Sequence, residues 1–83
     1  MSEMRSLVVT SYGEDQGETY RVALSSNNIA MVTTTEKLVE RQGMSLHKSI
    51  VKFLEDGSTA TLYLNGGDLR TLEEAVSCFW LDD

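Results

Sequence analysis

Apolar and polar residues alternate in parts of this chain, above all in 18–25 and 59–64, with the period of two that is typical of half-buried β-strands. Together with runs of β-branched and aromatic residues, this pattern predicts five strands: 5–12, 18–25, 29–34, 46–54 and 59–64. Within 18–25, the residues Tyr20, Val22 and Leu24 form the predicted inward row. The turn-forming residues in 13–17 predict that the first two strands form an antiparallel hairpin.

The last two predicted strands are separated by Asp56 and Gly57. A tight hairpin turn requires positive φ, which glycine adopts without steric cost, so this pair predicts a second hairpin. In 59–64, Leu62 and Leu64 share one face of the strand while Thr61 and Tyr63 share the other.

After Asn65, Gly66 and Gly67 the period changes from strand to helix. The apolar residues Leu69, Leu72, Val76 and Phe79 recur at helical spacing and predict an amphipathic helix. We expect Asp68 to be its N-cap, because a carboxylate accepts a hydrogen bond from a free backbone N–H of the first turn.

The pattern does not decide the structure of residues 35–45. Residues 36–42 are good helix formers and Gly43 is suited to end a short helix. The same residues also fit a long hairpin arm that extends the strands on either side.

These elements predict an α+β fold in a single domain, residues 1–83. The expected architecture is an antiparallel sheet of about five strands, a meander that is either open or partly closed, with one C-terminal helix on it. Several predicted strands are apolar on both faces, as Ile50 and Leu54 show opposite Val51 and Phe53. One helix covers only one face, so barrel closure, residues 35–45 or a partner must cover the other.

Thirteen acidic against seven basic residues give the chain a net charge of −6. Nucleic acids and anionic membranes are usually bound by a basic face, so we expect no direct binding to either. The charge suits a protein partner with a basic surface.

Catalytic chemistry has few candidates in this sequence. His47 and Cys78 are the only residues suited to a nucleophile–base pair, and Cys78 lies next to Phe79 and Trp80, where apolar surroundings make a thiol inert. A structural zinc site needs four nitrogen or sulfur ligands, and the chain has one histidine and one cysteine. We therefore expect no enzyme, no catalytic residues, no cofactor and no metal site. A single cysteine also suggests a reducing, cytoplasmic location, and no segment is apolar enough to span a membrane.

The leading hypothesis is a non-enzymatic protein-interaction module, either a homodimeric regulator or a small acidic inhibitor or adaptor. One form of the latter is a phage-encoded protein that covers a basic surface of a host enzyme. The predicted partner-binding residues are the aromatic Trp80 and Tyr63 and the acidic Glu14, Asp15 and Glu18. The alternative is a small-ligand or nucleotide-binding protein that uses the Gly66-Gly67 turn before the helix.

Overall fold

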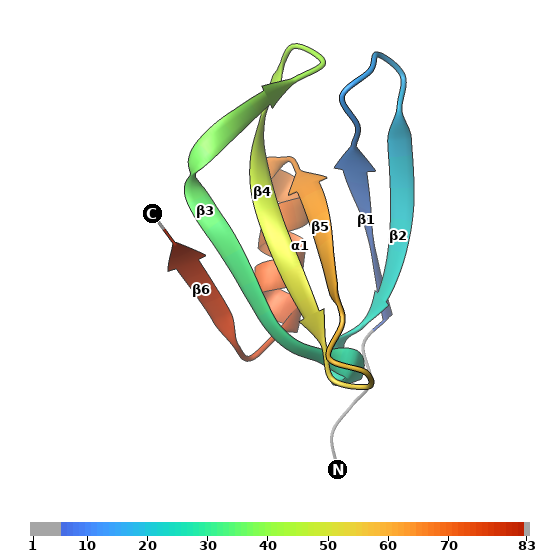
Figure 1. The fold of residues 1–83 in the computed structure, drawn as a ribbon, viewed down its shortest axis with the longest axis vertical. Helices are drawn as coiled ribbons and strands as arrows, with labels where there is room; N and C mark the ends of the chain where they lie inside the picture. The colour runs from blue at the N-terminus through green and yellow to red at the C-terminus, as the bar shows by residue number, and fades with distance from the viewer. Residues whose placement is uncertain (1–5, 83) are drawn as a thin grey trace.

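The computed structural model describes residues 6–82, which form strands, one α-helix and a short 3-10 helix (Figure 1). The elements follow in the order β1 (Ser6–Tyr12), β2 (Thr19–Ser25), η1 (Ser26–Asn28), β3 (Ile29–Arg41), β4 (Met44–Phe53), β5 (Thr59–Leu64), α1 (Gly66–Ala75) and β6 (Phe79–Asp82). Strands β1 and β2 form a separate antiparallel hairpin, and the other four pair in the order β5-β4-β3-β6. Strand β6 is parallel to β3, so the larger sheet is mixed.

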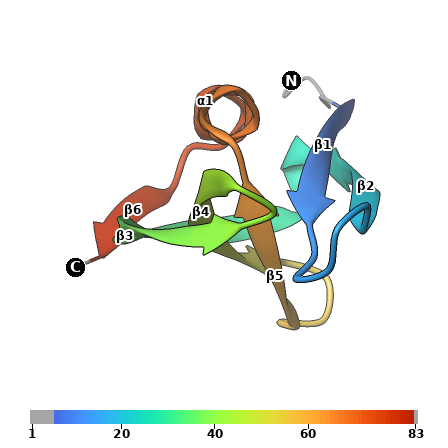
Figure 2. The same ribbon diagram turned by 90° about the horizontal axis from the view of Figure 1, so that it is seen from above.

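Helix α1 lies across one side of the four-stranded sheet, and the β1–β2 hairpin flanks the same side next to β5 (Figure 2). Between these three parts lies the apolar core. Its buried members are Leu7, Val9, Leu24, Ile29, Val32, Val51, Leu62, Leu64 and Leu72. Strands β1 and β5 each turn one row of aliphatic side chains toward this core, because successive side chains of a strand point to opposite faces.

The β-strand predictions are largely confirmed, because local alternation determines which segments are extended. Both predicted hairpins form, β1 with β2 and β4 with β5. Gly57 has a φ of +70°, as a glycine in such a turn needs. Arg5, which was included in the first predicted strand, lies outside the described residues.

The prediction of one five-stranded antiparallel meander is wrong, because β2 and β3 do not pair. The edge of β3 that a meander would give to β2 is paired with β6 instead. At the start of β3, Asn28 lies at the end of η1. Its backbone carbonyl accepts a hydrogen bond from the Leu54 N–H (2.8 Å), and its side-chain carbonyl accepts one from the Glu55 N–H (3.0 Å). These bonds attach the start of β3 to the end of β4. The chain therefore passes from β2 into a different sheet.

The helix prediction is correct in position but wrong at both ends. Asn65 is the N-cap in place of Asp68, since its side chain accepts a hydrogen bond from the Asp68 N–H at 2.8 Å. At the other end, Val76 is extended (φ −114°, ψ 148°) and Phe79 belongs to β6. Val76 and Phe79 still contact the core, so the apolar residues at helical spacing come from two different elements.

Residues 35–45 form the extended hairpin arm, which was one of the two alternatives. Strands β3 and β4 continue to a turn at Gln42 and Gly43, whose φ values are +53° and +75°. Two successive residues with positive φ are the signature of a two-residue type I′ hairpin turn. A register shift between Thr34 and Leu38 marks the base of the arm.

Tyr20 does not join the inward row of β2. Its side chain is 54% exposed, whereas Leu24 in the same row is buried. Tyr20 pairs with Ser11 near the loop end of the hairpin, where it donates a hydrogen bond from its hydroxyl to Glu18 at 2.8 Å. The hydrogen bond to the Glu18 carboxylate keeps the Tyr20 hydroxyl at the surface.

Candidate functional site

The side of the four-stranded sheet that faces away from α1 carries exposed apolar and basic side chains. We call it the outer sheet face, and its members are Met31 and Thr33 of β3, Lys48, Ile50 and Lys52 of β4, Thr59, Thr61 and Tyr63 of β5, and Trp80 of β6. The residues that alternate with them, such as Val32, Val51 and Leu62, are buried on the helix side.

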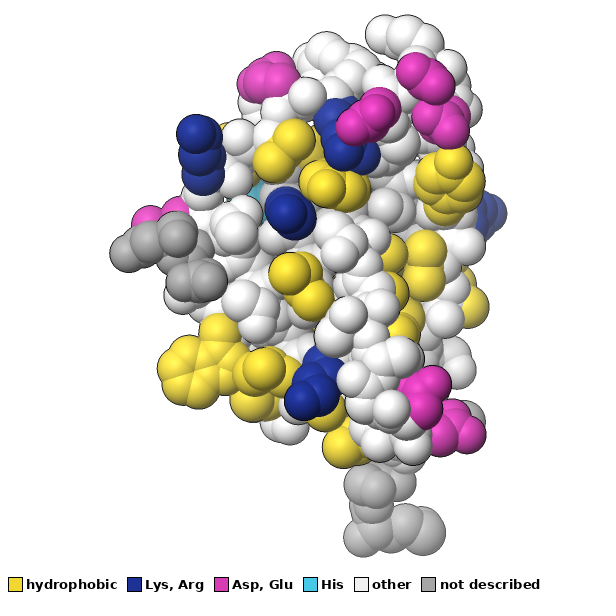
Figure 3. All heavy atoms as spheres, viewed as in Figure 1, with side chains coloured by type: hydrophobic (Ala, Val, Ile, Leu, Met, Phe, Trp, Pro, Cys, Tyr) yellow, Lys and Arg dark blue, Asp and Glu magenta, His cyan; other side chains and the backbone are white. Residues whose placement is uncertain are grey.

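One row of this face crosses all four strands. The strand register places Trp80 beside Thr33, Thr33 beside Ile50, and Ile50 beside Thr61. Trp80 is 59% exposed and Ile50 is 37% exposed. Figure 3, seen from this side, shows apolar and basic side chains over the sheet, with the acidic side chains toward the rim.

At the β5 edge of the same face, Tyr63 lies under the side chain of Arg41. The guanidinium carbon of Arg41 is 3.6 Å from the centre of the Tyr63 ring, a close cation–π contact. Strand alternation places the buried Leu46 on the same side of β4 as Lys48, next to this stack. The arm thus covers one end of the outer sheet face and leaves the row with Trp80 and Ile50 open.

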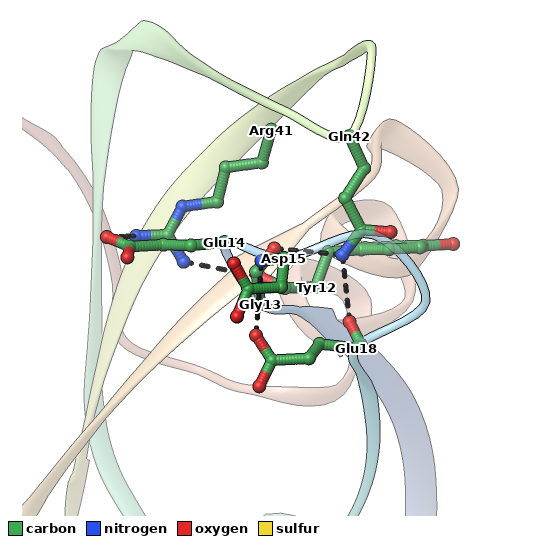
Figure 4. A network of polar contacts seen from close by, with 7 residues as sticks. All are labelled: Tyr12, Gly13, Glu14, Asp15, Glu18, Arg41 and Gln42. Atoms are coloured by element: carbon green, nitrogen blue, oxygen red, sulfur yellow. Dashed lines mark hydrogen bonds and ion pairs between the residues drawn. The ribbon is translucent and has the colours of Figure 1, made fainter.

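The tip of the arm also holds the β1–β2 loop, as Figure 4 shows. Arg41 donates to the Tyr12 carbonyl at 3.4 Å and forms an ion pair with Glu14 at 3.4 Å. Gln42 donates from its side-chain amide to the carbonyls of Gly13 (2.8 Å) and Glu18 (2.9 Å). These contacts join the two sheets at the end farthest from β6.

The acidic residues predicted to bind a partner lie together on this loop, and two of them are engaged within the chain. Glu14 is paired with Arg41, although its side chain remains 81% exposed. The Glu18 carboxylate accepts hydrogen bonds from the Tyr20 hydroxyl (2.8 Å) and the Asp15 N–H (3.1 Å). These bonds, above all that from Tyr20, hold the pKa of Glu18 below its ordinary value. The same contact raises the pKa of Tyr20, because losing its proton would place two negative charges side by side.

Of the predicted partner-binding residues, Trp80 and Tyr63 thus share one face of one sheet. They lie on its opposite edge strands, which are separated by three strand spacings of about 4.8 Å each. Glu14, Asp15 and Glu18 form a second, acidic group at the loop beyond Tyr63. The arm separates this loop from the row that contains Trp80.

A shallow hollow of about 150 Å³ lies at β6, lined by Ser77, Cys78, Phe79 and Trp80. The Trp80 indole N–H donates a hydrogen bond to the Cys78 sulfur at 3.3 Å, at the edge strand of the sheet. The Cys78 carbonyl accepts a hydrogen bond from the Val32 N–H at 3.0 Å.

His47 and Cys78 do not meet. Cys78 is bonded to β3 at Val32, whereas His47 pairs with Leu38 on the same strand. The partner of Val32 on β4 is Val51, four residues from His47, which is about 13 Å along the strand. The imidazole therefore cannot take a proton from this thiol.

The Gly66-Gly67 turn begins α1 and is closed by the chain itself. Asn65 accepts the Asp68 N–H, and the Asp68 carboxylate accepts the Thr10 N–H at 3.1 Å. A carboxylate beside the first turn of the helix repels an anionic ligand, and here it ties α1 to β1 instead.

Sequence reasoning noted Ile50 as part of a second apolar face but did not name it as a partner-binding residue, and it did not connect Lys48, Lys52 or Arg41 with this region. The alternation of Lys48, Ile50 and Lys52 in a strand is visible in the sequence and indicates a common face. That this face is the open one was not visible, because the sheet order decides which side the helix covers.

No helix within residues 6–82 is both long enough and apolar enough to cross a membrane. Comparison of the chain with known protein-family models, with curated proteins and with solved structures gave no match.

Proposed function

We propose that this chain is a non-enzymatic protein-interaction module that binds its partner through the outer sheet face. The observation that carries the proposal is the open row Trp80–Thr33–Ile50–Thr61, in which a tryptophan and an isoleucine are exposed on a regular, rigid sheet. Tryptophan is enriched among the residues that dominate binding energy at protein interfaces.

The composition of this face resembles an interface more than an ordinary strand surface. Its central strands carry the aliphatic Met31 and Ile50, the exposed Trp80 lies on the edge strand β6, and threonines and lysines lie between and around them. Protein interfaces commonly have an apolar centre with a polar rim. A sheet also presents these side chains without the loss of conformational entropy that a mobile loop would incur on binding.

Non-enzymatic action is supported by the separation of His47 and Cys78 along β3. The proposal includes a cytoplasmic location, for which the support is the single cysteine, Cys78. It covers two forms: an inhibitor or adaptor that binds another protein, including a phage-encoded inhibitor of a host enzyme, and a regulator that dimerises through this face.

The test compares two variants with the same chemical change at different places. Ile50→Glu puts a carboxylate in the centre of the outer sheet face, whereas Leu54→Glu puts one at the 61% exposed Leu54 in the β4–β5 loop. Immobilised wild-type protein is used to capture partners from a lysate, and each candidate is then purified and titrated against all three proteins. The mass of each protein in solution is measured at high concentration in parallel.

We expect Ile50→Glu to weaken binding, or self-association, at least tenfold, which corresponds to about 1.4 kcal/mol. Leu54→Glu is expected to bind as the wild type does. Equal effects of the two variants, or a monomer for which no purified candidate binds, would overturn the proposal. Circular dichroism of each variant checks that it is folded.

A further inference from the structure

The charge of the outer sheet face is opposite to that of the whole chain, and this difference indicates the chemistry of the partner. The chain carries −6, but the charged side chains that the structure describes on the outer sheet face are those of Lys48 and Lys52, and the acidic Asp82 comes at the end of β6, outside the open row. The ion pairs within residues 6–82 are formed by Arg41 and Arg70, so neither lysine is neutralised by a carboxylate of the described chain.

We infer that the partner binds the outer sheet face with an acidic, extended segment of polypeptide. This inference rests on the proposed function and adds the chemistry of the partner to it. It also differs from the expectation of a basic partner, because the acidic residues that motivated that expectation lie elsewhere on the molecule.

The spacing of the basic residues suits an extended peptide. Lys48, Ile50 and Lys52 occupy alternate positions of β4 and are therefore about 7 Å apart in succession. An extended segment with acidic, apolar and acidic residues at alternate positions has the same spacing. It places each carboxylate opposite a lysine and its apolar residue against Ile50 and Trp80.

The surroundings of the face favour a polypeptide over a nucleic acid. Two lysines neutralise few phosphates, and a longer polyanion would extend over the acidic rim. Figure 3 shows acidic side chains toward the rim of this view. The exposed Glu14 lies in the β1–β2 loop, and the exposed Glu55 and Asp56 lie in the β4–β5 loop. Binding to single-stranded nucleic acid generally requires a continuous basic path as well as aromatic stacking.

Trp80 provides a direct readout, because it is the only tryptophan in the chain and lies in the row that the segment would cover. The probes are four: the peptide Gly-Glu-Ser-Leu-Ser-Glu-Gly, the same peptide with lysine or with glutamine in place of glutamate, and single-stranded oligothymidine. Each is titrated to millimolar concentration at low ionic strength, and the emission of Trp80 is recorded.

The charge-reversed variant is Lys48→Glu/Lys52→Glu, and its matched control is Arg21→Glu/Arg70→Glu. Both variants change the net charge by the same amount, but Arg21 and Arg70 are exposed on β2 and α1, outside the outer sheet face. The control therefore separates an effect of this face from an effect of net charge.

We expect the wild type and the control variant to bind the glutamate peptide at least tenfold more tightly than the lysine peptide. The charge-reversed variant should show the opposite preference, since like charges that face each other are strongly unfavourable. The preference should also decrease as salt is added.

Four outcomes would overturn the inference: no change in Trp80 emission with any peptide, equal binding of all three peptides, tighter binding of oligothymidine, or a concentration-dependent change without any probe. The last of these would indicate a second copy of the chain as the occupant. If any of them occurs while Ile50→Glu still abolishes binding of a purified partner, the inference is wrong and the proposed function stands.

Discussion

At the scale of single residues, Arg41 makes contacts that a lysine cannot reproduce. Its planar guanidinium stacks on Tyr63 and at the same time reaches the Tyr12 carbonyl and the Glu14 carboxylate. Its side chain is only 17% exposed, so these contacts are partly shielded from water. A lysine has one compact charge and no flat surface to stack.

We predict that Arg41→Lys lowers the free energy of unfolding by about 1 kcal/mol, the usual size of a partly buried cation–π contact. Chemical denaturation measures the change. Arg70→Lys is the control, because Arg70 is 82% exposed and its ion pair with Glu74 contributes little. Equal losses in the two variants would show that the stack on Tyr63 does not stabilise the fold.

The second prediction at this scale concerns Glu18, whose pKa is lowered mainly by the hydrogen bond from Tyr20. A carboxylate with a lowered folded-state pKa stabilises the fold above its unfolded pKa, and this contribution is lost as the pH falls through the folded pKa. Tyr20→Phe should therefore raise the pKa of Glu18 toward its ordinary value. It should also make stability less sensitive to acid.

Carboxyl chemical shifts followed by NMR as the pH is lowered report the pKa of Glu18 directly. Asp56 is the control within the same sample, because its pKa is lowered mainly by the side chain of Ser58 and should not change. An unchanged pKa of Glu18 in Tyr20→Phe would show that the phenol is not the cause.

At the scale of elements, the start of α1 depends on Asn65. Its side chain accepts the Asp68 N–H, one of the first-turn donors that has no partner within a helix. We predict that Asn65→Ala lowers the free energy of unfolding by about 1 kcal/mol and that Asn65→Ser retains most of it, because serine is also a good N-cap. Thermal and chemical unfolding of the pair measure this. A serine variant as unstable as the alanine variant would argue against the capping role.

The end of α1 shows how a local pattern is overridden by strand pairing. Helical spacing continues through Phe79, but α1 ends at Ala75, Val76 is extended, and β6 begins at Phe79 and pairs with β3. β-Branched and aromatic residues lose side-chain freedom in a helix and fit well on a sheet. The unpaired edge of β3 offers these residues backbone partners that a longer helix cannot use.

At the scale of the whole molecule, helix α1 closes the core over both the sheet and the β1–β2 hairpin. Leu72 is the fully buried residue of α1 and belongs to the same cluster as Val9, Val51 and Leu64. We predict that Leu72→Ala lowers the free energy of unfolding by about 2–5 kcal/mol, through lost burial and the cavity that remains.

The control for this prediction is Leu54→Ala, since Leu54 is 61% exposed and its truncation should change stability by about 0.5 kcal/mol or less. Both variants are measured by chemical denaturation. A loss in Leu72→Ala as small as that of Leu54→Ala would mean that α1 is not essential to the core.

The distribution of charge is also a property of the whole molecule. The net charge of −6 suggested an acidic protein surface, but the fold gathers Lys48 and Lys52 on the outer sheet face, while the acids are spread over loops, α1, the arm of β3 and the end of β6. Net charge is a sum over all residues, so it does not tell where on the surface the charged side chains lie. Tyr63 and Trp80, which the sequence indicated for the face opposite the helix or for a partner, do lie on this face together.

The sequence by itself determined the extended segments, the two hairpins predicted from turn residues and the presence of a helix near the C-terminus. Each of these depends on side chains that are close along the chain, so alternation, helical spacing and turn chemistry are enough to predict them. The long arm was undecided, because Gln42-Gly43 is a weaker turn signal than Asn-Gly or Asp-Gly.

Only the tertiary structure decided which strands pair, where the helix ends and which side of the sheet stays open. β2 and β3 do not pair, because β6 occupies the edge of β3 that faces away from β4. The bonds from Leu54 and Glu55 to Asn28 attach the start of β3 to the end of β4. Such contacts join residues that are far apart in sequence, and several pairings of the same strands satisfy the local pattern equally well. The open row of Trp80 and Ile50 exists because α1 covers the other side.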